Sequence, residues 1–290
     1  MLCSGCGKRE GTRKCSACLA VVYCSTDCQK LHWKNGHSKD CGLQTKKNIH
    51  MASFLGKGDQ LKQILEVYPK ISLDWANPID GATAAYVAAQ EGRAECLFML
   101  SERGADLKKR TTNGYAPIHI ACRLGMVDSL RVLLSKGISP VTPTSLDPSV
   151  AETPGQLCII FGHIDCLALL YEYGVHPDTT NRHGQSDTHL ASLYGVEKAI
   201  QLALKSGGTV NLRDHRNHTP MDLALARDHK SCVTLLRSLG GLSTPKSPGT
   251  KTVILSGYGN VLSSEQTTLV WMVLYLFLII TITMNTHKSS

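Results

Sequence analysis

The 290-residue sequence predicts a mainly α-helical solenoid, preceded by a small metal-binding module and followed by one hydrophobic segment. Three observations lead to this prediction. Seven of the chain's 12 cysteines lie within its first 41 residues, in paired spacings. A sequence motif then recurs about every 33 residues, and an uncharged stretch extends from Gln266 to Thr286.

The N-terminal cysteines have the spacing of zinc ligands. Eight side chains form four pairs with two or three residues inside each pair: Cys3, Cys6, Cys15, Cys18, Cys24, Cys28, His37 and Cys41. Eight such ligands fill two tetrahedral Zn²⁺ sites with no open position, as in structural rather than catalytic sites. A segment this short buries little apolar surface, so the metal supplies much of its folding energy.

Disulfide bonds are the alternative, because cysteine-dense short modules of secreted proteins are usually held by them. The chain opens without a basic n-region or an apolar h-region, so we expect this end to stay in a reducing compartment. Paired CxxC spacings in a reducing compartment indicate zinc. We therefore expect two Zn²⁺ ions and no disulfides in this module.

The residues around the ligands resemble a known family. The run Val22–Gln29 (V-Y-C-S-T-D-C-Q), followed by His32-Trp33, resembles a MYND-type zinc finger, and the resemblance covers residues 3–41. In that family the ligand pairs interleave. The resemblance therefore implies one zinc site made of Cys3, Cys6, Cys24 and Cys28, and a second made of Cys15, Cys18, His37 and Cys41.

The same resemblance implies a docking function. MYND modules dock short proline-containing peptides, and Gln29 and Trp33 occupy positions that line the peptide groove in that family. The alternative interpretation is that Trp33 simply covers the zinc core, since a large aromatic side chain is suited to either role.

Residues 48–241 are predicted to form a repeat array. Equivalent heptapeptides lie at offsets of 33, 37, 33 and 33 residues, beginning at Ala82, Tyr115, Glu152, Gln185 and His218. The period and the segment Ala116–Ala121 (A-P-I-H-I-A) resemble the ankyrin repeat. Residues around Met51 have helical spacing without the T-P start, which indicates an atypical N-terminal capping unit. About six units result, more than the three that a stacked core needs.

The cysteines and motif histidines of this array have structural interpretations. Cys96, Cys166 and Cys232 share one repeat position, which favours a small apolar side chain between packed helices. The ankyrin resemblance implies that His119 and His189 form hydrogen bonds between neighbouring units rather than act as bases.

Basic residues recur in the loops just before successive motifs: Lys108, Lys109, Arg110, Arg182, Arg213 and Arg216. Stacking aligns these loop tips as a basic ridge, which predicts an acidic protein segment as partner. Solvated loop tips are often charged, so an unspecialised surface is the alternative. Nucleic acid is disfavoured, because the zinc module lacks a recognition helix and the net charge of +8 is moderate.

The C-terminal residues predict a membrane anchor. A flexible linker over 242–265 precedes the apolar run Leu269–Met284, and about 20 helical residues span a bilayer core. We therefore expect a transmembrane tail anchor over 266–286 with a short tail at 287–290. This arrangement predicts a single-pass protein with a cytosolic N-terminus, in the endoplasmic reticulum rather than the mitochondrial outer membrane. A short buried helix in a cytoplasmic or nuclear protein is the alternative.

These assignments leave no segment for a catalytic domain. A zinc module at 1–42, a basic linker at 43–47 and the array account for the chain before the tail, and no HExxH, GxSxG or Walker motif occurs. The sequence predicts a monomeric, non-catalytic scaffold on a cytosolic membrane face, whose two modules each bind a protein. The alternatives are a soluble transcriptional or co-repressor adaptor that docks proline-rich peptides, and an accessory subunit of a ligase or methyltransferase.

Overall fold

The computed structural model describes residues 13–14, 22–23, 26–32, 38–144 and 152–244. Its N-terminal elements are β1 (Arg13–Lys14), β2 (Val22–Tyr23) and α1 (Thr26–His32). The two strands pair antiparallel, with Arg13 opposite Tyr23 and Lys14 opposite Val22. Elements this short bury little surface, in keeping with a module that takes folding energy from a bound metal.

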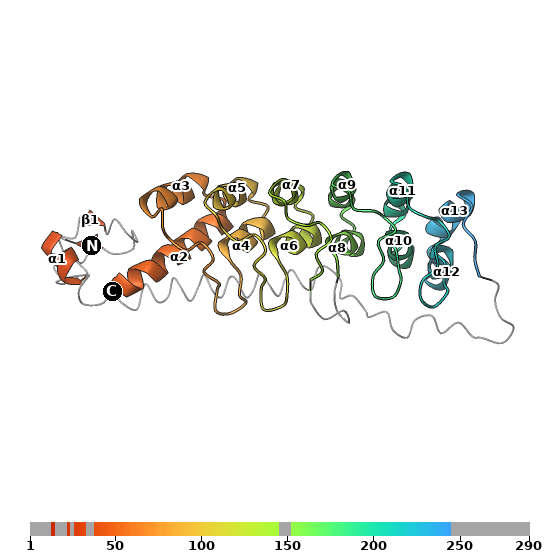
Figure 1. Ribbon diagram of the computed structural model, residues 1–290, viewed down its shortest axis with the longest axis horizontal. Coiled ribbons are helices and arrows are strands. Elements are labelled where there is room, and N and C mark those ends of the chain that lie inside the picture. The colour runs from red at the N-terminus through yellow and green to blue at the C-terminus, as the bar shows by residue number, and fades with distance from the viewer. Residues whose placement is uncertain (1–12, 15–21, 24–25, 33–37, 145–151, 245–290) are drawn as a thin grey trace. The chain divides into compact units, whose positions relative to one another are not determined.

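Twelve further helices pair in sequence order into six helical hairpins, units 1 to 6 (Figure 1). The first helices of the units are α2 (Ser38–Leu55), α4 (Ala84–Gln90), α6 (Pro117–Leu124), α8 (Pro154–Phe161), α10 (Asp187–Tyr194) and α12 (Pro220–Ala226). The second helices are α3 (Gly58–Val67), α5 (Ala94–Glu102), α7 (Val127–Ser135), α9 (Ile164–Glu172), α11 (Glu197–Lys205) and α13 (Lys230–Ser238). The predicted helical solenoid is confirmed.

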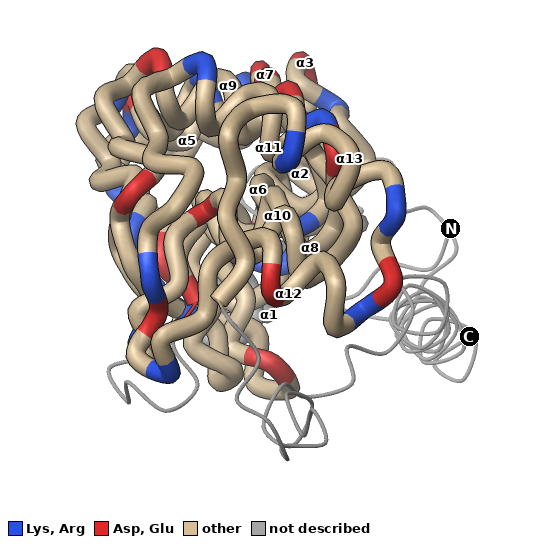
Figure 2. The backbone as a smooth tube through the Cα atoms, turned by 90° about the vertical axis from the view of Figure 1, so that its right-hand side faces the viewer, with Lys and Arg blue, Asp and Glu red and all other residues tan. Residues whose placement is uncertain are grey.

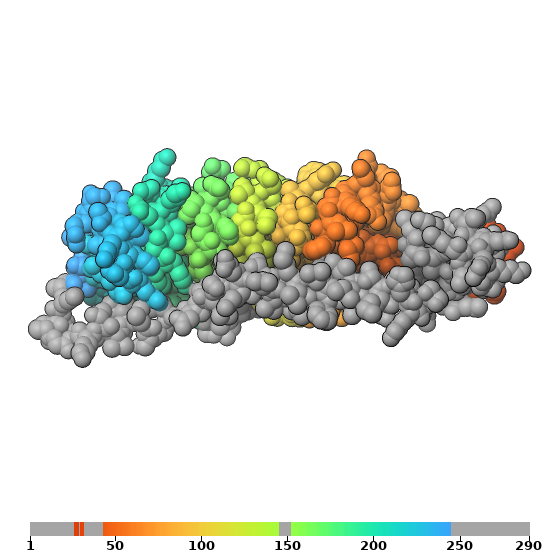
Figure 3. Space-filling model, turned by 180° about the vertical axis from the view of Figure 1, so that it is seen from behind, coloured from red at the N-terminus to blue at the C-terminus, as the bar shows by residue number. Residues whose placement is uncertain are grey.

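The units stack side by side in chain order. Figure 1 shows the first helices in one layer and the second helices in another, with a loop descending between consecutive units. In the space-filling view of Figure 3 each unit of the array contacts the unit of the next colour. We call the segment between the second helix of one unit and the first helix of the next an inter-repeat loop.

Local sequence sets where the first helices begin and end. The Thr83 hydroxyl accepts a hydrogen bond from the backbone N–H of Tyr86 at 3.2 Å, and Thr153 and Thr219 cap α8 and α12 in the same way. Such a cap stabilises a helix by about 1 kcal/mol. Helices α6, α8 and α10 each end at a glycine with φ between 73° and 77°, a conformation that costs glycine no steric strain.

The cysteines of the array belong to its core. All five are at most 1% exposed: Cys96, Cys122, Cys158, Cys166 and Cys232. Burial raises the pKa of the Cys96 and Cys232 thiols, which keeps them neutral at physiological pH. Their predicted role as small apolar packing residues is confirmed.

Buried histidines connect neighbouring units. The Nε2 of His119 donates to the carbonyl of Thr142 at 2.7 Å, and the Nε2 of His189 donates to the carbonyl of His218 at 3.1 Å. On the other side of the ring, Nδ1 of His119 accepts from the N–H of Ala116 at 2.9 Å. Burial lowers the pKa of His119 to about 4, so the ring is neutral and can donate and accept at once. The predicted structural role of these histidines is confirmed.

The first unit contains an equivalent histidine bond, which the sequence pattern did not indicate. His50 in α2 donates through Nε2 to the carbonyl of Ala82 at 3.1 Å and is only 7% exposed. Burial lowers its pKa as well. Unit 1 is therefore joined to unit 2 as a full repeat, although it lacks the T-P start.

A second set of bonds joins the turns between the two helices of a unit to the preceding unit. His163 Nε2 donates to the carbonyl of Arg123 at 2.9 Å, and His229 Nε2 donates to that of Leu193 at 3.1 Å. Arg93 Nε makes the corresponding bond to the carbonyl of Phe54 at 3.4 Å. The sequence shows that Arg93, His163 and His229 are equivalent in the repeat. Spacing alone does not show which backbone carbonyl each side chain contacts.

Both sets of bonds join the same pairs of units: 1 with 2, 3 with 4, and 5 with 6. At the two intervening junctions the turn position is occupied by Met126 and Val196, which carry no donor, and the motif position by Tyr86 and Gln156. These two kinds of bond therefore occur at alternate junctions, whereas other polar contacts, such as the Lys136–Glu102 ion pair and the Tyr171–Asp187 bond, join the remaining units.

Two predictions about the segments flanking the array meet different outcomes. The linker predicted at 43–47 lies inside α2, where Gln44 Nε2 donates to Asn48 Oδ1 at 3.1 Å.

No helix of the described ranges is long and apolar enough to cross a bilayer. The longest, α2, has 18 residues but includes Lys39, Lys46 and Lys47, whereas a span needs about 20 mainly apolar residues. This finding corrects the prediction of a single-pass membrane protein, whose anchor at 266–286 and flanking residues 245–265 and 287–290 lie outside the described residues.

A buried carboxyl group lies at the junction of units 4 and 5. Asp187 is 4% exposed and stands at the first position of α10, where α6, α8 and α12 have proline. Its Oδ2 accepts a hydrogen bond from the Tyr171 hydroxyl at 2.8 Å. A Cβ at Gly155 would lie 3.8 Å from that oxygen, an ordinary van der Waals contact, so the carboxyl group packs against the start of α8. Burial raises the pKa of Asp187 from 3.8 to about 7, with a further rise from Asp178 and opposition from the Tyr171 hydrogen bond.

We expect Asp187→Asn to stabilise the array increasingly as pH rises. A raised carboxyl pKa contributes stability that is complete below 3.8 and is lost as pH rises through about 7. Because asparagine does not ionise, the unfolding free energy of the variant relative to wild type should grow by about 2 kcal/mol between pH 5 and pH 8. Urea unfolding at several pH values measures this difference. Asp165→Asn, on the exposed first turn of α9, is the matched control. If the unfolding free energies of wild type and Asp187→Asn changed with pH in the same way, the assignment would be contradicted.

Candidate functional site

Only part of the predicted zinc module is described. Cys28 lies in α1 and is partly exposed, and Cys41 lies in α2. The other six predicted ligands lie outside the described residues: Cys3, Cys6, Cys15, Cys18, Cys24 and His37. Among the residues that the structure covers, no group of three or more potential metal ligands is assembled.

The described elements still fit a zinc module. In the sequence Cys15 follows β1 and Cys24 follows β2, and because the two strands are antiparallel they lead into these cysteines at opposite ends of the strand pair, which suits ligands of two different sites. Thiolates and imidazole are the donors that Zn²⁺ prefers in structural sites. Gln29 lies in α1 next to Cys28, whereas Trp33 lies outside the described residues.

The basic ridge is not uniform along the array. In the loop between units 2 and 3, the Arg110 guanidinium donates to the carbonyls of Gly114 at 2.9 Å and Pro143 at 2.7 Å, and also to that of Thr144. Lys109 Nζ donates to the carbonyl of Asp74 at 2.6 Å. These two side chains hold inter-repeat loops together, and in this loop only the Lys108 side chain is exposed among the three predicted basic residues.

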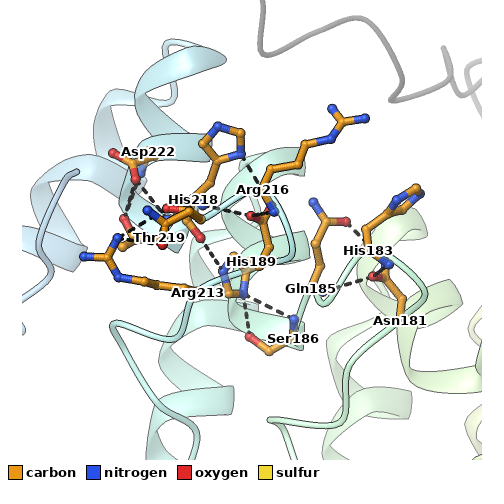
Figure 4. A network of polar contacts seen from close by, with 12 residues as sticks. Asn181, His183, Gln185, Ser186, His189, Arg213, Arg216, His218, Thr219 and Asp222 are labelled. Atoms are coloured by element: carbon orange, nitrogen blue, oxygen red, sulfur yellow. Dashed lines mark hydrogen bonds and ion pairs between the residues drawn. The ribbon is translucent and has the colours of Figure 1, made fainter. Parts of the chain in front are cut away.

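The loops before units 5 and 6 present their basic residues differently. Arg182, Arg213 and Arg216 are all exposed. In one loop the Asn181 Oδ1 accepts from the backbone N–H groups of His183 and Gln185, at 2.9 and 3.0 Å. Figure 4 shows the Arg216 side chain extending away from this polar network, whereas His189 lies within it.

The next loop repeats the turn with an aspartate. Asp214 Oδ1 accepts from the N–H groups of Arg216 at 2.9 Å and His218 at 2.8 Å. The backbone N–H of His215 donates to the carbonyl of His183 at 2.9 Å, which joins the two loop tips directly. Figure 2, which looks along the row of repeats, shows the charged positions mainly around the outside of the array and few within it.

A second surface was not found from the sequence. The Arg123 guanidinium lies over the rings of Tyr115, at 5.5 Å from the centroid, and Phe161, at 5.2 Å. Nearby, burial raises the pKa values of Glu152 and Tyr115. All four side chains are partly exposed, on the first-helix side of units 3 and 4. Tyr115, Arg123 and Phe161 occupy three different repeat positions, so no recurring pattern in the sequence indicated that they would meet.

Comparison with known proteins identifies the larger part of the chain. A family model described as ankyrin repeats (three copies) matches residues 49–144 and 151–244, more than half of the chain. The chain belongs to the ankyrin-repeat family. A second family model, the MYND finger, matches residues 3–41 of this ankyrin-repeat protein. Both resemblances expected from the sequence are therefore confirmed.

Several proteins share part of the ankyrin-repeat chain. Synphilin-1 of Mus musculus is 29% identical over 172 residues, which cover 57% of this chain and 18% of the relative. The putative E3 ubiquitin-protein ligase XBAT31 of Arabidopsis thaliana is 26% identical over 224 residues, which cover 71% of this chain and 40% of the relative. Protein phosphatase 1 regulatory subunit 27 of Mus musculus is 41% identical over 68 residues, which cover 23% of this chain and 44% of the relative. The chain thus spans less than half the length of each of these relatives.

Solved structures show the same fold. The ankyrin repeat domain of human ASB11 superposes with a TM-score of 0.60 at 20% identity, covering 77% of this chain and 96% of that one. The ankyrin repeat domain of Bcl-3 superposes with a TM-score of 0.59 at 22% identity, covering 69% of this chain and 89% of that one. Ankyrin arrays and MYND fingers bind proteins, and a MYND finger binds zinc. The predicted zinc cofactor and protein partners are confirmed at that level.

We expect Arg110→Ala to destabilise the array although the residue belongs to the basic ridge. The substitution leaves the partly buried carbonyls of Gly114 and Thr144, and the exposed one of Pro143, without their charged donor, at a cost of about 2 kcal/mol in unfolding free energy. Arg216→Ala, at an exposed loop tip, should change that energy by less than about 0.5 kcal/mol. Urea unfolding of the two variants compares them directly, and equal effects would show that Arg110 has no special structural role.

Proposed function

We propose that this protein is a non-catalytic adaptor whose MYND finger and ankyrin array each bind a protein partner. The observation that carries the proposal is the joint occurrence of two protein-binding families in one chain. The histidines of the array support it, because His119 and His189 are fully buried and form bonds to backbone groups between units. Two linked modules gain effective concentration, so partners bound weakly to each are still brought together.

In the proposed zinc module two Zn²⁺ ions are bound in the interleaved arrangement given above, within residues 1–42. Support comes from the family match over 3–41 and from the β1–β2 hairpin that leads into Cys15 and Cys24. Gln29 and Trp33 are the proposed contacts for a proline-containing peptide. The ions are structural, because all four positions of each site are taken by protein ligands.

The proposed partner of the array is an acidic protein segment bound along the basic ridge. Its exposed members carry this proposal: Lys108, Arg182, Arg213 and Arg216. Lys109 and Arg110 support the loops from within. Loops on a rigid scaffold are where binding residues concentrate, and here the stacked helices supply that scaffold.

A second candidate function is substrate binding for a ubiquitin ligase. It is favoured by one observation, namely that XBAT31, a relative over 71% of the chain, is named a putative E3 ubiquitin-protein ligase. Under this proposal the array holds the substrate and the MYND finger holds the catalytic partner. Ubiquitin transfer in the presence of the chain and its partners separates it from a plain adaptor.

We expect the purified full-length chain to contain two zinc ions. Cys24→Ser and Cys15→Ser each remove one thiolate from a different proposed site, so each should lower the zinc content to about one ion per chain. Elemental analysis together with protein concentration measures this ratio. Cys96→Ser, in the core of the array, is the control and should retain both ions. A wild-type content of one ion would refute the two-site assignment.

We expect two separable sets of partners. The double variant Cys15→Ser/Cys24→Ser, whose zinc module is unfolded, should lose one set, and Arg182→Glu/Arg216→Glu should lose the other. Quantitative mass spectrometry of proteins co-purified with each variant measures the loss. Lys205→Glu/Arg237→Glu is the matched control, because it reverses the same number of charges in the same two units but on the second helices α11 and α13. If one variant lost every partner and the other none, the adaptor proposal would fail.

A further inference from the structure

Three thiols meet in the core of units 3 and 4, and we call them the thiol cluster: Cys122, Cys158 and Cys166. Cys122 lies in α6, Cys158 in α8 and Cys166 in α9. Helix α8 packs against both α6 and α9, which are its neighbours in the two layers of the array (Figure 1). The Cys158 side chain is hydrogen-bonded to those of Cys122 and Cys166, and all three are fully buried. Cys158 therefore has two sulfur neighbours and no access to solvent.

Cys158 stands where the other units have alanine. It lies five residues after the N-cap residue Thr153, and the equivalent residues of units 2, 3, 5 and 6 are Ala88, Ala121, Ala191 and Ala224. Units 2 and 6 also have a cysteine at the position of Cys166, but neither has one at the position of Cys158. The alanines show that packing at this position needs only a methyl group, and one sulfur atom in its place creates the cluster.

Cys122 faces the junction between units 3 and 4. In unit 6, which no further described unit follows, the equivalent residue is Leu225, and it is 47% exposed. In units 2 to 5, where another unit follows, the residue at this position is 0% exposed. The contact between Cys122 and Cys158 therefore crosses the junction, whereas Cys158 and Cys166 belong to one helical hairpin.

The packed array protects the cluster from oxidants. Burial raises the pKa of the Cys158 thiol, and the hydrogen bond to Cys122 raises it further, although the bond to Cys166 acts in the opposite direction. The pKa of Cys166 is raised chiefly by its bond to Cys158 and then by burial. Because the thiolate is the form that reacts with oxidants, these thiols react only when this part of the array opens locally.

We propose that the thiol cluster is a redox latch, in which Cys122 and Cys158 form a disulfide that joins units 3 and 4 when hydrogen peroxide reaches them during local opening. The Cys158 sulfur first attacks one peroxide oxygen, so that the O–O bond breaks, an S–O bond forms, and a sulfenic acid and water result. The Cys122 sulfur then attacks the Cys158 sulfur, so that an S–S bond forms, the S–O bond breaks and a second water leaves. The two thiols lose two electrons and two protons in total, and the peroxide takes them up as it becomes two waters.

The latch would act on the exposed surface of the same two units. Arg123 directly follows Cys122 and lies over the ring of Phe161 in unit 4, at 5.2 Å from the centroid. A disulfide between α6 and α8 would fix the spacing of the helices that carry these two side chains. Oxidation would thus set the shape of a surface that a partner can contact, a form of regulation that goes beyond the adaptor proposal.

The test treats the full-length, reduced chain with hydrogen peroxide, blocks the remaining thiols and maps the disulfides of the monomeric fraction by mass spectrometry of tryptic peptides. We expect Cys122 to be linked to Cys158, and Cys96 and Cys232 to stay free thiols although they are also buried. Urea just below the unfolding transition should speed formation of the link, since reaction proceeds from the opened array. The oxidised chain should unfold at a higher urea concentration than the reduced chain, because the disulfide restricts the unfolded state.

Alanine variants separate the three thiols, and each introduces a residue that the array already has at that repeat position. Cys122→Ala and Cys158→Ala copy the alanines of unit 2, and both should abolish the link and the shift in urea midpoint. Cys166→Ala copies the alanine of unit 5 and is the matched control, which should keep both. Circular dichroism checks that each variant is folded.

Three results would overturn the inference. A link that does not form even in urea, where the opened array is populated, would show that the two sulfurs cannot reach the geometry of a disulfide. A disulfide between Cys158 and Cys166 instead would confine the oxidation to one hairpin. An unchanged urea midpoint after the Cys122–Cys158 link has formed would show that the link does not hold the units together. The partner-capture experiment above decides the adaptor function independently of all three.

Discussion

The neutral imidazole buried between two units is the interaction on which the array most depends. Each helical hairpin is too short to bury its apolar face alone, so its stability comes from the neighbouring unit. The histidine ring fixes that neighbour by accepting a bond from the start of its own helix and donating one to the next inter-repeat loop. Its burial, which lowers the pKa of His119 to about 4, keeps both bonds available across the physiological range. The loops and their charged tips hold their positions because these rings hold the units.

The pattern of residues predicted the repeat architecture well, because period and helix-end chemistry are local properties. The glycines at 125, 162 and 195 and the threonine caps follow from the conformation of single turns. The interpretation of the cysteines held for a similar reason, since a position filled by Cys, Ser and Ala in different units needs a small side chain whatever the neighbours are.

Contacts across units could not be predicted in the same way. Arg110 was assigned to a binding ridge because it is basic and close to a loop tip. The inter-repeat loop after Ile138 is four residues longer than its counterparts, and it places the carbonyls of Pro143 and Thr144 within reach of that guanidinium. Spacing shows which position a side chain occupies within its own repeat. It does not show which backbone group of a neighbouring repeat that side chain contacts. The same limit concealed the bonds of His50, His163 and His229.

The alternation of junctions has a mechanical consequence. Polar bonds from buried or partly buried rings reinforce every odd junction, whereas the junctions of units 2 with 3 and 4 with 5 lack donors at the turn position. The junction of units 4 and 5 also holds the protonatable Asp187. As pH rises, ionisation of that carboxyl group should therefore loosen this junction before the others, and the curvature of the solenoid should change there.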